Sequence, residues 1–413
     1  MAPSRDEIIA LAERALRRAG GEAQATAWWE RQLSAGAGGA VTTEAVTVEI
    51  AVVRDGRVGT VVTTDVDDDG LARAAAGAAL LAATGPEASG LPEPAPGRPH
   101  DGYSLPTTDP AEVGERLGEW SSWRAGAAGT AIVSNRGVST YEERSFGDLR
   151  VRRHADGRSL ELTAATVDAG ELDPAALRAE ADSLLGTDPA TTGIGPGEYP
   201  VVLGAWAVAE VLRRAALAFG GPQSPLAGRL GSQVAAPAVN LSESPRFAAT
   251  LPRSYDAQGV PRQPLPLIQD GVAHRFVGPD TGHAQAPGGV GGFFPEHLVL
   301  VGGGAADISE LAAPVELGLF IPALSLHGAW VLGRPGSALA EGVRVIRAGR
   351  PAEPAPNLSV LFEPLELLTR VQALTGRQRT IPPPSSGRPA PPRRRLRPPC
   401  ARRAAYTSRA RLR

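Results

Sequence analysis

The sequence predicts an α+β protein in which a mixed α/β N-terminal domain precedes a β-rich, mainly antiparallel C-terminal domain. Two observations predict this fold class. Up to about residue 193, capped helices alternate with strands that are joined by Asp-Gly turns, whereas short apolar runs between Gly and Pro predominate over 194–374. The length of 413 residues allows two or three domains.

The first elements follow from caps and turns. Ser4 and Glu7 have the spacing of a capping box, in which a hydroxyl and a carboxylate satisfy the first backbone N–H groups of a helix. Alternating apolar residues over 46–52 predict a strand. The elements expected here are a helix that ends at Gly20-Gly21, a hairpin over 46–64 with its turn at Asp55-Gly56, and a helix capped within 67–69 that ends at Gly85-Pro86.

After a Pro-rich loop over 90–110, the same order of elements returns about a hundred residues later. The expected elements are a helix opened by Asp109-Pro110 with Val113, Leu117 and Trp120, strands over 131–133 and 138–142, a hairpin over 149–166 turned by Asp156-Gly157, and a helix opened by Asp173-Pro174. This recurrence suggests an internal duplication of helix–hairpin–helix units. Two unrelated segments that use common turns are the alternative.

A second break over 193–200 opens the C-terminal domain. A buried strand over 201–203 and a helix over 205–219 come first, and Gly220-Gly221-Pro222 ends that helix. The remaining expected elements are strands over 247–251, 298–301, 319–321, 329–332 and 343–346, and helices over 308–312 and 363–374.

The segment from Ser254 to Asp280 combines a Tyr-Asp pair, a Gly-x-Pro turn and a hairpin whose turn is Asp270-Gly271. Its pattern is Asp256, Gly259 and Pro261, followed by Leu267, Ile268, Gly271 and Val272. This pattern resembles an element of the TldD/PmbA family, once called modulators of DNA gyrase. Looser matches to the closing strands of that family occur over 297–304, 316–320 and 345–349, so that the resemblance extends over about 46–374.

In the TldD branch of this family, a His-Glu-x-x-x-His helix follows a Val-Val-Leu strand, and a later cysteine completes a zinc site. The strand is present here as Val201 to Leu203, but no histidine occurs between His154 and His274. Arg213 and Arg214 in the following helix would repel a dication. The resemblance therefore implies a non-catalytic, TldE/PmbA-like subunit of a zinc metallopeptidase heterodimer. It also implies that zinc is held by a TldD-like partner and that the pair processes unfolded peptides.

We expect substrate contacts from Tyr255, Asp256 and Gly259 and from His283, and we expect no catalytic or metal-binding residue in this chain. The strand-rich domain and its Gly-rich loop over 288–292 offer edges to an extended peptide. An alternative is a stand-alone metallopeptidase or other hydrolase whose metal is held by His274, His283 and His297. Their spacings fit no standard pair of ligands.

Charge and cysteine content limit the remaining classes of function. Residues 383–413 carry ten arginines and no acid, which leaves 32 arginines against 44 acidic residues, a net charge of −12, in the rest of the chain. We expect the tail over 375–413 to be disordered. It is interpreted either as a nucleic-acid-binding arm or, preferably, as the product of a frame shift in a GC-rich gene. Cys400 is the single cysteine, and no apolar run is long enough to cross a membrane, so we expect a cytoplasmic protein.

Overall fold

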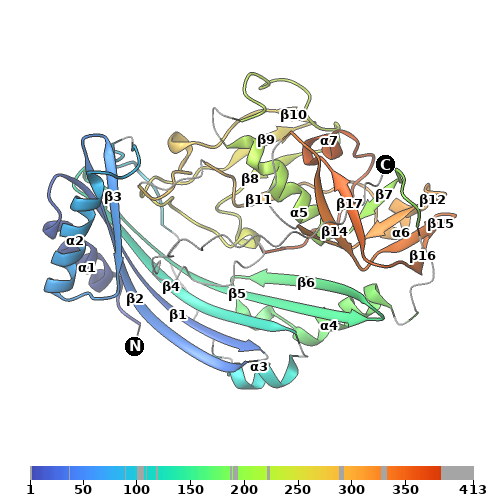
Figure 1. The fold of residues 1–413 in the computed structure, drawn as a ribbon, viewed down its shortest axis with the longest axis horizontal. Helices are drawn as coiled ribbons and strands as arrows, with labels where there is room; N and C mark the ends of the chain where they lie inside the picture. The colour runs from blue at the N-terminus through green and yellow to red at the C-terminus, as the bar shows by residue number, and fades with distance from the viewer. Residues whose placement is uncertain are drawn as a thin grey trace, which may run out of the picture.

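The structure is a computed structural model. It describes residues 2–36, 38–88, 90–99, 107, 109–117, 120–186, 188, 194–220, 224–287, 293–326 and 333–382. Figure 1 shows a long curved sheet at the N-terminal end of the chain, with a second group of smaller sheets on its inner side. The predicted α+β fold class is confirmed. Among the described residues, no helix is long and apolar enough to cross a membrane.

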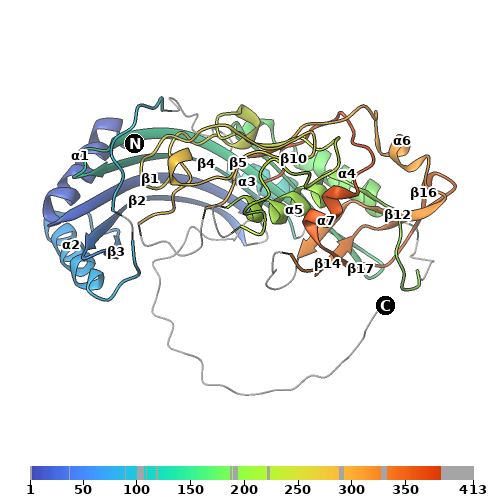
Figure 2. The same ribbon diagram turned by 90° about the horizontal axis from the view of Figure 1, so that it is seen from above.

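A six-stranded antiparallel sheet in the order β3-β2-β1-β4-β5-β6 forms the centre of the N-terminal domain. Its elements are α1 (Arg5–Arg18), β1 (Glu22–Gly36), β2 (Gly39–Arg54), β3 (Arg57–Thr63), α2 (Asp68–Ala82), α3 (Pro110–Arg116), β4 (Ser122–Ser134), β5 (Ser139–Ala155), β6 (Arg158–Thr166) and α4 (Pro174–Leu185). α1, α2 and α3 lie on the side of the sheet away from the C-terminal domain (Figures 1 and 2), whereas α4 contacts that domain through Glu180 and Leu184.

The predicted caps are confirmed. The Ser4 backbone N–H donates to Glu7 Oε2 over 2.7 Å, and the Glu7 N–H donates back to the Ser4 hydroxyl over 3.3 Å. The side chains of Asp67, Asp109 and Asp173 accept from the first turns of α2, α3 and α4. Each carboxylate satisfies N–H groups that have no partner within the helix, and its charge suits the positive end of the helix dipole.

The three predicted Asp-Gly turns are also confirmed. Both residues of each turn have positive φ, with 52° and 71° at Asp55-Gly56, 47° and 74° at Asp156-Gly157, and 48° and 78° at Asp270-Gly271. This backbone conformation matches the twist of the flanking strands, and aspartate and glycine adopt it at low cost. Ala348-Gly349 forms a fourth turn of the same kind, with φ of 45° and 77°.

The two halves of the N-terminal domain have the same order of elements, because each contains a helix, three antiparallel strands and a second helix. Their strands are arranged symmetrically about the contact between β1 and β4, as the sheet order shows. Different strand orders would have contradicted an internal duplication. The duplication itself stays a prediction.

The strands of this domain are longer than the sequence predicted. β1 was not predicted at all, although it contains Trp28 and Trp29, because its run of Ala, Gln, Trp and Glu lacks a clear alternation. The predicted strands over 138–142 and 149–154 are parts of the single strand β5. Neighbouring strands and the helices that cover the sheet supply the burial that the local pattern does not signal.

The outer core of the sheet is rich in alanine, which lets the helices pack closely. Ile8, Ala12 and Ala15 of α1 are buried against alanines of β1 and β4. α2 lies so close to β3 that a Cβ added at Gly59 would be 2.1 Å from the carbonyl oxygen of Ala78. Glycine is therefore required at this contact for space and not for its backbone angles.

Three sheets around one helix form the C-terminal domain. In order, the strands are β10-β9-β8-β11, β16-β15-β12-β7 and β13-β14-β17. Its elements are β7 (Val201–Leu203), α5 (Ala205–Ala216), β8 (Leu241–Glu243), β9 (Leu265–Gln269), β10 (Val272–Ala273), β11 (Leu298–Leu300), α6 (Ile308–Ala312), β12 (Leu317–Ile321), β13 (Ala323–Leu326), β14 (Gly336–Glu341), β15 (Arg344–Arg347), β16 (Arg350–Pro354), β17 (Leu358–Phe362) and α7 (Pro364–Thr369). The central helix is α5, which packs against residues of all three sheets.

Two predictions for this domain are wrong. The strand predicted over 247–251 is a 3-10 turn, because the Thr250 hydroxyl bonds back to the carbonyl of Ser244 and Leu251 takes a left-handed φ of 56°. The helix predicted over 363–374 ends at Thr369, since the chain then pairs with residues 303–305. The predicted strand over 329–332, the Gly-rich loop over 288–292 and residues 383–413 of the predicted tail lie outside the described residues. Residues 375–382 of that tail are described, and the first two of them form backbone hydrogen bonds with Gly303 and Ala305.

We predict that Gly59→Ala lowers thermal stability by about 1 to 3 kcal/mol, the usual cost of overpacking a close contact. Thermal unfolding followed by circular dichroism measures the effect. Gly20→Ala is the matched control, because a Cβ at Gly20 meets nothing within 4 Å. Equal melting temperatures for the two variants would contradict the close packing of α2 on β3.

Candidate functional site

The junction between the two domains is built around the buried carboxylate of Glu142 on β5. Its oxygens accept from Arg253 Nε over 2.6 Å and from the Ser254 backbone N–H over 2.7 Å. Burial alone would raise the pKa of Glu142, but the charge of Arg253 and the Ser254 N–H hold it below its usual value. An ionised carboxylate of the N-terminal sheet therefore anchors the start of the segment that resembles the family pattern.

The next residues of that segment lie against the same sheet. Gln24 of β1 donates a side-chain N–H to the Ala257 carbonyl over 2.9 Å. The Asp256 carboxylate accepts from three backbone N–H groups, those of Gln258, Val260 and Ala284. Burial nevertheless raises the pKa of Asp256. These bonds close the Asp-x-x-Gly turn and tie it to the chain after His283.

All four residues predicted to contact substrate are buried, namely Tyr255, Asp256, Gly259 and His283. The structure brings Tyr255, Asp256 and Gly259 together at the domain junction, and joins His283 to it through the backbone of Ala284. Their contacts give each of them a structural role. Because none exposes a side chain, a direct contact with substrate at these positions stays a prediction.

We predict that Gly259→Ala destabilises the junction by about 1 to 3 kcal/mol. Gly259 has a φ of 81°, and an added Cβ would lie 2.5 Å from Val138 Cγ1 of the N-terminal domain. Urea denaturation measures the loss. Gly228→Ala is the matched control, because its φ of 78° is similar but nothing lies within 4 Å of the added Cβ. Equal losses would show that the contact with Val138 has no effect.

A second buried cluster joins two of the three histidines that the sequence singled out. Glu243 of β8 accepts on Oε1 from His283 Nε2 over 3.2 Å and from His297 Nδ1 over 3.0 Å. The backbone N–H of His297 donates to the other oxygen over 2.8 Å. Thr281 Oγ1 contacts the second ring nitrogen of His283 over 3.1 Å. Each imidazole thus lies beside the buried carboxylate of Glu243 inside the domain.

The alternative prediction of a metal site formed by His274, His283 and His297 is wrong. His274 is exposed on the hairpin after β10 and does not join His283 and His297. Among the described residues, no group of three or more His, Cys, Asp or Glu side chains has a geometry suited to a metal ion. Within the part of the chain described here, the alternative of a stand-alone metalloenzyme with these three ligands is therefore not supported.

We predict that Glu243→Gln lowers stability near neutral pH by on the order of 3 kcal/mol. Burial would raise the pKa of Glu243, but its bonds to His283 and His297 lower it from 4.5 to about 2. A lowered folded-state pKa gives stability that is complete above the unfolded-state value and is lost as the pH falls toward 2. Urea denaturation should therefore show the gap between parent and variant shrinking from about pH 5 downward.

Glu115→Gln on the exposed surface of α3 is the control, and it should leave the pH dependence unchanged. A gap between Glu243→Gln and the parent that stays constant down to pH 2.5 would contradict an ionised Glu243.

β7 and α5 are the strand and the helix that would carry a zinc site in the TldD branch. β7 pairs in parallel with β12, and Gly204 begins α5 directly after it. Trp206 is buried and donates its Nε1–H to the Thr163 carbonyl of β6 over 2.8 Å. The helix is thus fixed between both domains.

The residues of α5 do not fit a zinc ion. Its charged side chains are Glu210, Arg213 and Arg214, and Glu210 forms ion pairs with both arginines, at 3.6 Å from Arg214. Burial, together with the neighbouring Arg214, lowers the pKa of Arg213 to about 10. A zinc site needs several nitrogen, sulfur or carboxylate ligands. Here a single carboxylate is already neutralised by two cations.

The last described residues of the chain cross the same helix. Arg379 lies over the ring of Trp206, 5.0 Å from the ring centroid, and pairs with Glu180 of α4 over 2.7 Å. Arg213 donates to the Pro382 carbonyl over 3.3 Å. This C-terminal segment therefore bridges the two domains and covers part of α5.

Comparisons with known proteins agree with this architecture. Residues 196–394 match the family described as the PmbA/TldA metallopeptidase C-terminal domain. Residues 196–394 therefore carry a domain of the PmbA/TldD family. No curated protein matches it by sequence.

Solved structures show the same fold over nearly the whole chain. TldE from Thermococcus kodakarensis is 18% identical, with a TM-score of 0.74 over 90% of this chain and 94% of that chain. A putative modulator of a DNA gyrase from Thermotoga maritima is 19% identical, with a TM-score of 0.72 over 92% and 95%. A second one, from Bacteroides thetaiotaomicron, is 16% identical, with a TM-score of 0.71 over 92% and 97%. At these identities, the structures establish the fold of this chain.

Sequence reasoning missed the residues that hold the predicted segment in place. Glu142 and Gln24 lie more than a hundred residues before it, and the local sequence around each gives no sign of these long-range contacts. Glu243, which joins His283 to His297, lies between two serines and forms no local pattern. Only the closeness of His283 and His297 in sequence was a usable signal.

Proposed function

We propose that this chain is a non-catalytic, TldE-like subunit that binds unfolded peptides and acts with a TldD-like zinc peptidase. The observation that carries this proposal is the composition of α5. In the TldD branch, the resemblance places two imidazoles and a general base on the helix after the Val-Val-Leu strand. Here that helix carries Glu210, Arg213 and Arg214, and Glu210 forms ion pairs with both arginines.

The chemistry of peptide hydrolysis explains why this difference matters. A catalytic zinc ion lowers the pKa of its bound water, and the adjacent glutamate accepts the proton during attack on the peptide carbonyl. Without ligands on α5, that step belongs in a partner. Zinc in this account is bound by the TldD-like subunit, and this chain contributes binding surface.

A peptide-binding role is supported by two features of the described residues. The inner face of the sheet beside the junction is polar and half-buried, with Trp28 and Glu30 on β1 and Arg144 stacked 5.8 Å from the ring of Phe146 on β5. Outside the tail, the net charge of −12 favours peptides that carry basic residues. Because unfolded cytoplasmic polypeptide is the substrate in this proposal, the complex would act in the cytoplasm.

Co-expression with a homologue that carries the His-Glu-x-x-x-His motif tests the proposal. We expect a one-to-one complex that cleaves a quenched fluorescent peptide with basic residues, while this chain alone does not. Replacing the first motif histidine of the homologue by alanine should abolish cleavage without dissociating the complex. Cleavage by the lone chain, or failure of the two proteins to associate, would contradict the proposed role.

A further inference from the structure

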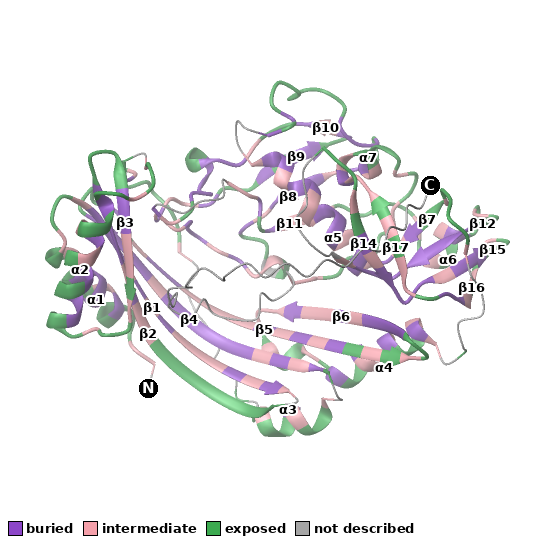
Figure 3. Ribbon diagram, viewed as in Figure 1, coloured by how far each residue is buried: buried purple, intermediate pink, exposed green. Residues whose placement is uncertain are grey.

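The second strand of the N-terminal sheet has an unpaired edge. β1 pairs with β2 along residues 39–53, whereas β3 pairs with β2 only along residues 48–54. Within the described part of the chain, no strand lies on the other side of residues 39–47. Figure 3 shows this part of β2 as exposed, and each residue from 39 to 45 is exposed. Among the described residues, this nine-residue stretch presents, at alternate positions, backbone N–H and C=O groups that no strand pairs with.

The composition of this edge favours pairing with another strand. Residues 39–47 read GAVTTEAVT, with one charged residue, Glu44, and no proline. Val41 has 53% of its surface exposed. Proteins usually protect a free edge with charges, proline or a bulge, because an exposed regular edge is a template for an incoming strand. Only Glu44 protects this edge.

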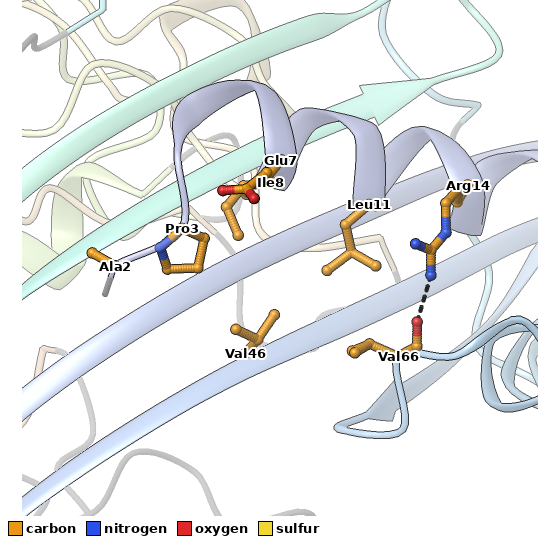
Figure 4. A pocket seen from close by; sticks show the side chains of 8 residues that line it. All are labelled: Ala2, Pro3, Glu7, Ile8, Leu11, Arg14, Val46 and Val66. Atoms are coloured by element: carbon orange, nitrogen blue, oxygen red, sulfur yellow. Dashed lines mark hydrogen bonds between the residues drawn. The ribbon is translucent and has the colours of Figure 1, made fainter.

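A shallow pocket of about 350 Å³ lies where β3 ends and the free edge begins. Figure 4 shows Ile8 and Leu11 of α1 above Val46 of β2, with Val66 from the loop after β3 at one side. Arg14 holds that loop by donating to the Val66 carbonyl over 2.7 Å. The floor of the pocket is aliphatic, so it suits an aliphatic side chain.

A strand that pairs with the free edge would also reach the pocket. Val46 has the same parity along β2 as Val48 and Ile50, which are buried on the helix-covered face of the sheet. A strand paired with residues 39–47 would direct alternate side chains to that face, and one of them would reach the pocket. β3 provides an internal precedent, because it fills the adjoining part of the same edge and packs Val61 against the same core.

We propose that an extended segment of unfolded polypeptide binds along residues 39–47 of β2 as an additional strand and places one aliphatic side chain in the pocket under α1. Backbone bonds supply affinity for many sequences, and the pocket selects an apolar residue. The neighbouring acids Glu7 and Glu44 favour basic residues beside it. This inference rests on the peptide-binding part of the proposed function and names where the peptide lies.

The test uses the full chain and a fluorescein-labelled ten-residue peptide in which leucine alternates with arginine and threonine. Fluorescence anisotropy should show binding. Two analogues N-methylated at alternate residues remove the N–H groups along one edge of the peptide or along the other. We expect one analogue to bind about tenfold or more weakly and the other to bind like the parent peptide, because a strand pairs through one edge.

Variants of the protein locate the site. Val46→Arg fills the pocket with a charge and Val41→Lys places a charge on the free edge, so each should weaken binding about tenfold. Leu80→Lys is the matched control, because Leu80 on α2 has 76% of its surface exposed and does not line the pocket. Circular dichroism establishes whether each variant is folded. If Val46→Arg does not fold, Val41→Lys still tests the site.

Four outcomes would overturn the inference. Equal binding of both N-methylated analogues, or binding unaffected by Val41→Lys and Val46→Arg, would place the peptide elsewhere while leaving a peptide-binding subunit intact. No binding, together with a dimer in light scattering that Val41→Lys converts to monomer, would show that a second copy of the chain pairs with this edge. If the chain is monomeric, binds no peptide and still associates with the homologue that carries the zinc motif, the proposed peptide site is wrong but the partner role stands.

Discussion

The buried carboxylate of Glu142 joins the two domains where the segment after Arg253 begins. It belongs to β5 but satisfies Arg253 and the Ser254 N–H of the other domain, and this ties the turn at Asp256 to the sheet. Removing one partner of such a buried pair leaves the other charge without compensation, which is far costlier than the net value of the pair. The segment that resembles the family pattern is thus a connector, and its residues are buried because they hold the domains together.

Helix α5 forms a separate contact between the domains, because it lies between the sheets of its own domain and β6 of the other. Trp206 donates to the Thr163 carbonyl, and Arg379 lies over the face of its ring. In such a position a helix can carry either a catalytic centre at a domain interface or, as here, an internally neutralised cluster of Glu210, Arg213 and Arg214. In the proposed role, the same scaffold supports binding without chemistry, and a peptide held at the free edge of β2 in the other domain is available to the proposed partner.

Local chemistry was predictable from the sequence, and long-range pairing was not. The caps at Ser4, Asp67 and Asp173 and the three Asp-Gly turns depend on a few adjacent residues, so their types alone indicate them. β1 escaped prediction because its strand character comes from β2 and β4 on its two sides. The contacts of Glu243 with His283 and His297 join residues 40 and 54 positions apart, and no periodicity encodes such a contact.

The central claim is that this chain has no catalytic zinc site of its own, and the zinc content of the purified chain tests it most directly. The chain would be expressed alone in zinc-supplemented medium and dialysed, and its zinc content would be measured by mass spectrometry. Our account predicts far less than one zinc per chain, because the one carboxylate of α5 is paired with two arginines. One tightly held zinc per chain, together with peptide cleavage that a chelator abolishes, would contradict it.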